Sequence, residues 1–88
     1  MNLYRIYTES LPTIRQKQIK LANKQFSGLT ISTGTGVWKG KSERSFIIEI
    51  VAEPADSGRI ATLAEGIKKL GRQESVLVTS LPIEAKFI

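Results

Sequence analysis

The sequence of 88 residues contains no cysteine and no histidine. Without cysteine the chain has no disulfide and no thiol nucleophile, and without either residue it lacks the usual ligands of zinc. Histidine is also the commonest general base of enzymes, so most catalytic classes lose their central residue. The composition therefore predicts a protein that is not an enzyme, with no catalytic residue, no metal and no cofactor.

Long hydrophobic runs are also missing. No apolar segment approaches the roughly 20 residues that a membrane helix needs, and the N-terminus "MNLYRIYTES" lacks the basic and apolar regions of a secretion signal. We expect a cytoplasmic protein without a membrane partner. The length indicates one domain over residues 1–88, with 83–88 as a C-terminal tail, and a domain this small gains much from an oligomer interface.

Charge is what the chain does have. Thirteen Lys and Arg against eight Asp and Glu give a formal net charge of +5, which makes an acidic protein target, a small anionic ligand or nucleic acid plausible as partner. The basic residues gather in two segments, which could bind such a partner. Alternatively, they only form a solvated helix face and a soluble hairpin tip. The two clusters are Arg15, Lys17, Lys20 and Lys24, and then Lys39, Lys41 and Arg44.

Apolar periodicity predicts the order strand, helix, strand, strand, helix, strand. This order is typical of an α+β, ferredoxin-like βαββαβ sandwich, an antiparallel sheet with two helices on one face. Right-handed connections place the first and third strands in the middle. The expected strands cover 2–8, 28–38, 45–51 and 75–80; the first helix starts at Leu11 with Ser10 as its cap, and the second runs to Leu70.

The stretch "GTGVWKGKS" at 34–42 invites comparison with phosphate-binding loops. A Walker loop needs a glycine five positions before Gly40, where Thr35 stands, and it must lead into a helix. Here a predicted strand follows instead. A glycine-rich connection between strands is therefore the favoured interpretation.

Ligand or partner contacts are nevertheless expected around this connection. Trp38 can stack on a base or nucleotide ring between basic residues, or it can close one end of the core. Glu49, inside an apolar strand, can anchor a ligand amine, pair with Arg5, or simply be exposed. The candidate binding residues are Trp38, Lys39, Lys41, Arg44, Glu43 and Glu49.

The helices leave one face of the predicted sheet uncovered. On it we expect residues of alternate register, with either Leu3, Arg5 and Tyr7 or Tyr4, Ile6 and Thr8 from the first strand. Apolar side chains on an exposed face indicate an interface, so the sequence predicts a homo-oligomer, with a monomer of scattered apolar surface as the alternative. The expected interface residues are Ile47, Val51, Arg5 and Tyr7.

Four short motifs lie between Phe26 and Val78. They are F-x-G-L-T at 26–30, G-x-G-x-W-x-G at 34–40, E-x-S at 43–45 and Q-E-x-V-x-V at 73–78. This series resembles small uncharacterised proteins of phages and bacteria, related in pattern to a bacterial domain-of-unknown-function family. The resemblance implies a ferredoxin-like fold and a phage or mobile-element origin, and it implies no activity.

The motif residues Glu43, Ser45, Gln73 and Glu74 can meet at one end of the sheet only if the connections fold back over it. The simpler expectation is that Gln73 and Glu74 only terminate the connection between helix and strand.

Three functions follow from these observations. The leading one is a non-enzymatic binding protein that acts as an inhibitor or sequestering protein, through a protein surface or a small anionic ligand. The alternative is sequence-independent nucleic-acid binding through the basic helix and the Trp38 loop. Catalysis with Glu43, Glu49 or Glu74 as general base is the least favoured, because none of them has an evident partner residue.

Overall fold

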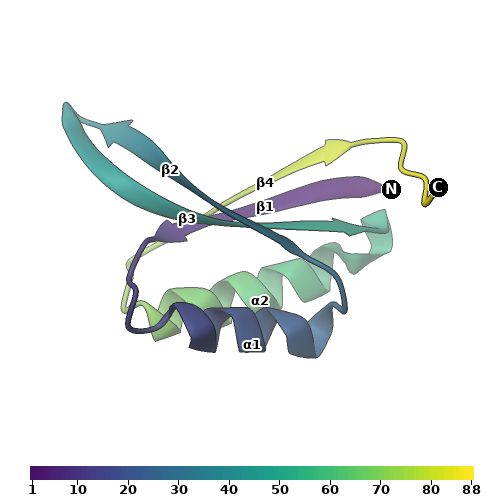
Figure 1. Cartoon of the computed structure of the whole chain (residues 1–88), viewed down its shortest axis with the longest axis horizontal. Coiled ribbons are helices and arrows are strands. Elements are labelled where there is room, and N and C mark those ends of the chain that lie inside the picture. The colour runs from purple at the N-terminus through teal and green to yellow at the C-terminus, as the bar shows by residue number, and fades with distance from the viewer.

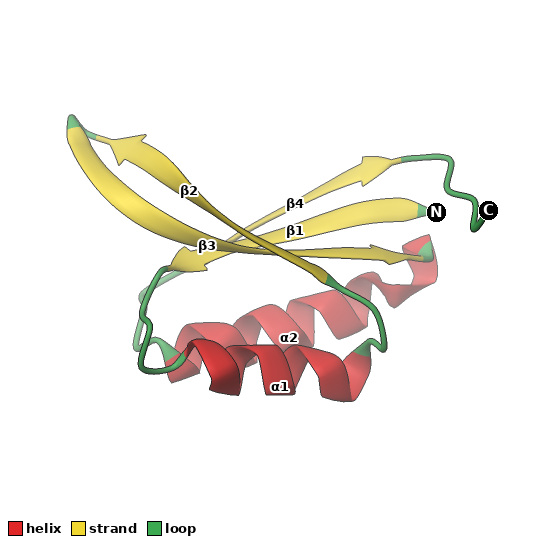
Figure 2. Cartoon of the chain, in the orientation of Figure 1, coloured by secondary structure: helices red, strands yellow, loops and turns green.

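The computed structural model describes all 88 residues as one sheet with two helices packed on one of its faces (Figure 1). The helices lie side by side beneath the sheet, and the loops gather at its two ends (Figure 2). The elements are β1 (Asn2–Glu9), α1 (Arg15–Gln25), β2 (Thr30–Trp38), β3 (Lys41–Ala52), a 3₁₀ turn (Pro54–Asp56), α2 (Ser57–Leu70) and β4 (Leu77–Pro82).

The strand order is β2-β3-β1-β4, and every neighbouring pair is antiparallel. β1 and β3 are therefore central, as the right-handed connections predict. The α+β, ferredoxin-like fold class is confirmed. The glycine-bearing β2 lies at one edge and the short β4 at the other.

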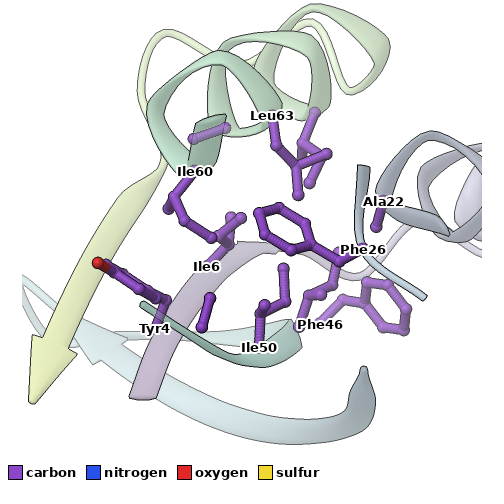
Figure 3. Close-up of a cluster of buried hydrophobic side chains, with 12 residues drawn as sticks. Tyr4, Ile6, Ala22, Phe26, Phe46, Ile50, Ile60 and Leu63 are labelled. Carbon is purple, nitrogen blue, oxygen red and sulfur yellow. The ribbon is translucent and has the colours of Figure 1, made fainter. Parts of the chain in front are cut away.

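The core lies between the central strands and the helices. β1 turns Tyr4 and Ile6 toward the helices, and β3 turns alternate residues from Phe46 to Ala52 the same way. Ile6 stands opposite Ile48 across the two strands, and both are fully buried. Figure 3 shows Ile6 and Ile50 in one cluster with Ile60 and Leu63 of α2 and Ala22 of α1. Each buried isoleucine stabilises the fold by roughly 2 kcal/mol.

The second helix ends at Leu70, as its sequence predicts. Asp56 occupies its N-cap without a side-chain hydrogen bond to the helix; the Asp56 carboxylate instead accepts a hydrogen bond from the Glu53 backbone N–H at 3.2 Å in the preceding 3₁₀ turn. Gly71 occupies the C-cap. No helix of the structure is long and apolar enough to cross a membrane.

The predicted start of the first helix is wrong. α1 begins at Arg15 with Ile14 at the N-cap, and no side chain caps it. Ser10 instead accepts a hydrogen bond from Arg15 Nη2 at 2.6 Å. Pro12 disfavours the helical conformation only at Leu11. Residues 12–14 form a turn, in which the Ile14 N–H donates to the Leu11 carbonyl at 3.1 Å, and the helix follows this turn.

β2 and β3 form a hairpin that extends beyond the rest of the sheet, at the left of Figure 1. β1 ends opposite Ser45, so residues 35–44 have no third strand beside them, and we call them the hairpin arm. Lys39 and Gly40 form its two-residue turn with φ of 50° and 76°. Positive φ at both positions is the type I′ geometry that matches the twist of the flanking strands.

Candidate functional site

Three segments that are distant in sequence meet at the end of the sheet from which the hairpin arm projects. They surround a pocket of about 580 Å³, which we call the end pocket. The end of β1 supplies Tyr7, Thr8 and Glu9, the hairpin supplies Trp38, Glu43 and Ser45, and the connection from α2 to β4 supplies Arg72, Gln73, Glu74 and Ser75.

The connection from α2 folds back over the sheet because of the way the helix ends. The Gln73 N–H donates to the Lys68 carbonyl at 3.0 Å, and the Arg72 N–H donates to the Lys69 carbonyl at 3.2 Å. These two bonds form a Schellman motif, in which the residue after the C-cap is left-handed. Arg72 takes that conformation with φ of 51°. The chain thereby reverses, and Gln73 and Glu74 reach the end pocket.

A side-chain hydrogen bond holds this connection against the sheet. Gln73 Nε2 donates to Thr8 Oγ1 at 2.7 Å, across 65 positions of the sequence. Behind Thr8, on the helix side, lies the fully buried Gln18 of α1, whose Nε2 is 3.5 Å from the same hydroxyl. The Gln18 Oε1 atom has no hydrogen-bond partner. Thr8 therefore links the core to the wall of the end pocket.

The lining of the end pocket carries more negative than positive charge. Its lining holds the three carboxylates Glu9, Glu43 and Glu74 against one basic residue, Arg72, which gives a formal charge of −2. Trp38 adds an indole ring that is 71% exposed. Carboxylates attract a positive charge, and an aromatic face attracts a cation through its ring quadrupole.

The less favoured alternative for the E-x-S and Q-E motifs, that they meet at one end of the sheet, is the one that the structure has. Glu43, Ser45, Gln73 and Glu74 all line the end pocket. The simpler expectation is that Gln73 only terminates the connection between helix and strand. Its backbone does end the helix, but its side chain also donates a hydrogen bond to Thr8.

The candidate binding residues separate into groups. Trp38 and Glu43 line the end pocket, whereas Lys39, Lys41 and Arg44 are exposed residues of the hairpin arm outside its lining. Arg44 points to the helix side, because it alternates with Glu43 along β3. The basic helix α1 lies on the other side of the sheet from Trp38, so the lysines of α1 and the Trp38 loop do not form one surface.

Glu49 lies in the middle of the uncovered face, away from the end pocket. It pairs with Arg5, with Nε to Oε2 at 3.2 Å, as one of the expected alternatives has it. The hydrogen bond to Glu49 and the charge of that carboxylate raise the pKa of Arg5 above its ordinary value. An exposed ion pair of this kind adds little stability.

The uncovered face carries the register with Leu3, Arg5 and Tyr7 from β1, while Tyr4, Ile6 and Thr8 are buried beneath the sheet. Ile47 and Val51 lie opposite Tyr7 and Leu3, so the four expected interface residues share this face. Leu77 and Leu81 of β4 extend its apolar part and are 60% and 53% exposed.

Several residues of the end pocket escape the sequence analysis. Glu9 and Thr8 end an ordinary amphipathic strand, and Arg72 occupies a position where glycine is usual. The only signal available for Gln18 is its place among the apolar positions of α1, where a polar residue falls on the buried side.

Comparison with known proteins gives a fold and no family. No family model and no curated protein matches the chain. Among solved structures, a phage SAM lyase in its apo state matches with a TM-score of 0.70 and 19% identity, over 91% of this chain and 78% of the lyase. A DUF3240 family protein from Shewanella baltica matches with a TM-score of 0.76 and 12% identity, over 99% of this chain and 93% of that protein.

At these identities the similarity shows a shared fold. One neighbour belongs to a domain-of-unknown-function family, which is consistent with the coarse outline of the resemblance seen in the sequence. The other neighbour is a phage enzyme, so the same fold serves catalysis in at least one protein.

Proposed function

We propose that this protein is a small binding protein that sequesters an organic cation in the end pocket. The observation that carries the proposal is the lining itself, in which Glu9, Glu43 and Glu74 outnumber the single Arg72 beside the exposed ring of Trp38. The charge balance favours a cation over the small anion that the lysines of the hairpin arm suggest, because Lys39 and Lys41 do not line this pocket.

S-adenosylmethionine is the ligand that we propose. It carries a sulfonium charge that suits the carboxylates and an adenine ring that can stack on Trp38. A protein of similar fold is named for acting on this compound, which supports the choice. The pocket volume of about 580 Å³ is within the usual range of small-molecule sites.

We propose binding without turnover, by a protein that a phage or mobile element encodes to withdraw a metabolite from the host. The chain has no histidine and no cysteine, and the phage source of one structural neighbour supports the origin.

Calorimetric titration with S-adenosylmethionine and S-adenosylhomocysteine tests the proposal, because the second compound lacks the sulfonium charge. We expect the charged ligand to bind about tenfold more tightly, which corresponds to about 1.4 kcal/mol. Glu43→Gln and Glu74→Gln should each weaken binding by a similar factor. Glu84→Gln, in the exposed tail, removes the same charge outside the pocket and serves as the matched control.

The outcomes separate the parts of the proposal. Equal affinity for both compounds would show that the carboxylates do not recognise charge, and no binding of either compound at millimolar concentration would exclude this ligand class. Chromatography of the ligand after incubation should recover it unchanged. Conversion would leave the site in place but show that the protein is an enzyme.

We also propose that the protein is a homo-oligomer whose subunits meet through the uncovered face. Val51, Leu77 and Leu81 expose about half of their surface there, and covering them removes apolar area from water. Light scattering after gel filtration should give a multimer at micromolar concentration, and Val51→Glu should shift it toward the monomer. A monomeric mass of the unaltered chain would contradict this.

A further inference from the structure

A second recessed surface lies on the helix layer, on the opposite side of the molecule from the uncovered face. A groove of about 510 Å³ runs between α1 and α2, which lie side by side in opposite directions (Figure 1). Its floor contains Leu21 and Leu70, both half-buried. Its walls are the exposed lysines Lys17, Lys20, Lys24 and Lys69. We call it the lysine groove.

The two helices approach closely at Gly66, which also lines the groove. A Cβ atom at this position would lie 2.7 Å from Leu21 Cδ2, closer than side-chain atoms tolerate. Glycine at this position therefore lets Leu21 of α1 pack against α2. Glycine in a helix costs about 1 kcal/mol of stability relative to alanine. The two leucines together form a floor that stays partly exposed.

Positive charge is concentrated in this layer. The two helices carry seven Lys and Arg and one acidic residue, Glu65, a formal charge of +6. The whole chain has +5, so everything outside the helices carries −1. The four lysines of the groove take part in none of the three ion pairs of the structure. Their charge is therefore free to meet an acidic partner.

We propose that the lysine groove binds an acidic amphipathic helix of a partner protein. Leucine or similar side chains of the partner would cover Leu21 and Leu70, and its flanking carboxylates would meet the lysines. A nucleic acid fits less well, because its phosphates would engage the lysines and leave both leucines in water. The lining also holds no aromatic ring on which bases stack.

A panel of fluorescent synthetic peptides provides the probe. Each has about 14 residues, a helix of roughly 21 Å, with leucines at different i, i+3, i+4 and i+7 combinations and glutamates on the flanks. At least one should bind saturably, with the change followed by fluorescence anisotropy. Its Leu→Ser and Glu→Gln versions should each bind about tenfold more weakly or worse, since both contacts are needed.

Charge reversal in the protein locates the site. Lys20→Glu with Lys24→Glu should weaken peptide binding by about tenfold or more. The matched control reverses Lys39 and Lys41 on the hairpin arm, where binding should change less than about twofold. All four side chains are exposed, so we expect both variants to fold, and circular dichroism checks this.

The proposal is overturned if no peptide of the panel binds, or if the Leu→Ser version binds as tightly as its parent. It is also overturned if single-stranded oligothymidylate binds the groove more tightly than the peptides, which would assign the lysines to nucleic acid. Titration of both double variants with S-adenosylmethionine keeps this question separate from the end pocket.

Discussion

Replacing the buried polar residue Gln18 by an apolar one tests how this protein packs its core. It is fully buried between α1 and the sheet, its Oε1 atom has no partner, and its Nε2 atom is 3.5 Å from Thr8 Oγ1, at the limit of a hydrogen bond. A buried polar group without a partner costs about 1 to 3 kcal/mol. We therefore expect Gln18→Leu to stabilise the fold.

The magnitude follows from what the substitution keeps and removes. Leucine and glutamine have similar helix propensity, so the backbone contribution is close to zero. The orphaned carbonyl disappears and its place is taken by an apolar side chain of similar size. The free energy of unfolding should rise by about 1 to 2 kcal/mol, which for a domain of this size raises Tm by roughly 4 to 16 °C.

Urea denaturation followed by circular dichroism measures this change, and two double-mutant cycles interpret it. The bond of 2.7 Å between Thr8 and Gln73 predicts a coupling free energy of about 1 kcal/mol, and the contact of 3.5 Å between Thr8 and Gln18 predicts one near zero. The cycles use Thr8→Val with Gln73→Leu and with Gln18→Leu. A loss of stability in Gln18→Leu, with strong coupling to Thr8, would refute the reasoning by showing that the glutamine carbonyl is satisfied.

Three further substitutions test the fold at separate points, each by thermal or urea unfolding. Arg72→Gly should raise stability by about 1 kcal/mol, because the left-handed conformation at this position disfavours a side chain; no gain would mean that the arginine side chain makes stabilising contacts. Gly40→Ala should lower stability by about 1 kcal/mol for the same reason at φ of 76°, and an unchanged Tm would contradict the type I′ turn. Ile48→Ala should cost about 2 to 5 kcal/mol, because it leaves a cavity beneath the centre of the sheet; a loss below 1 kcal/mol would place Ile48 outside the core.

The order of helices and strands could be predicted from the sequence because local patterns of apolar residues encode it. Alternation in 2–8 and 45–51, with helical spacing of apolar residues between Ile60 and Leu70, specifies which residues share a face. Right-handed connections then leave one sheet order, which the structure has. The motifs around Glu43 and Glu74 also contain residues that line one pocket in the structure, although the sequence favoured only a terminating role for Gln73 and Glu74.

Tertiary structure alone decided which face of β1 is buried, because both registers carry apolar side chains and only packing against the helices distinguishes Leu3 from Tyr4. It also decided that Glu43 and Glu74 line one pocket, because this depends on the left-handed turn at Arg72 and the bond from Gln73 to Thr8, across 65 positions. Periodicity describes how a segment presents its own side chains. Which distant segments meet is set by turn geometry and long-range hydrogen bonds, and neither has a signature in the local pattern.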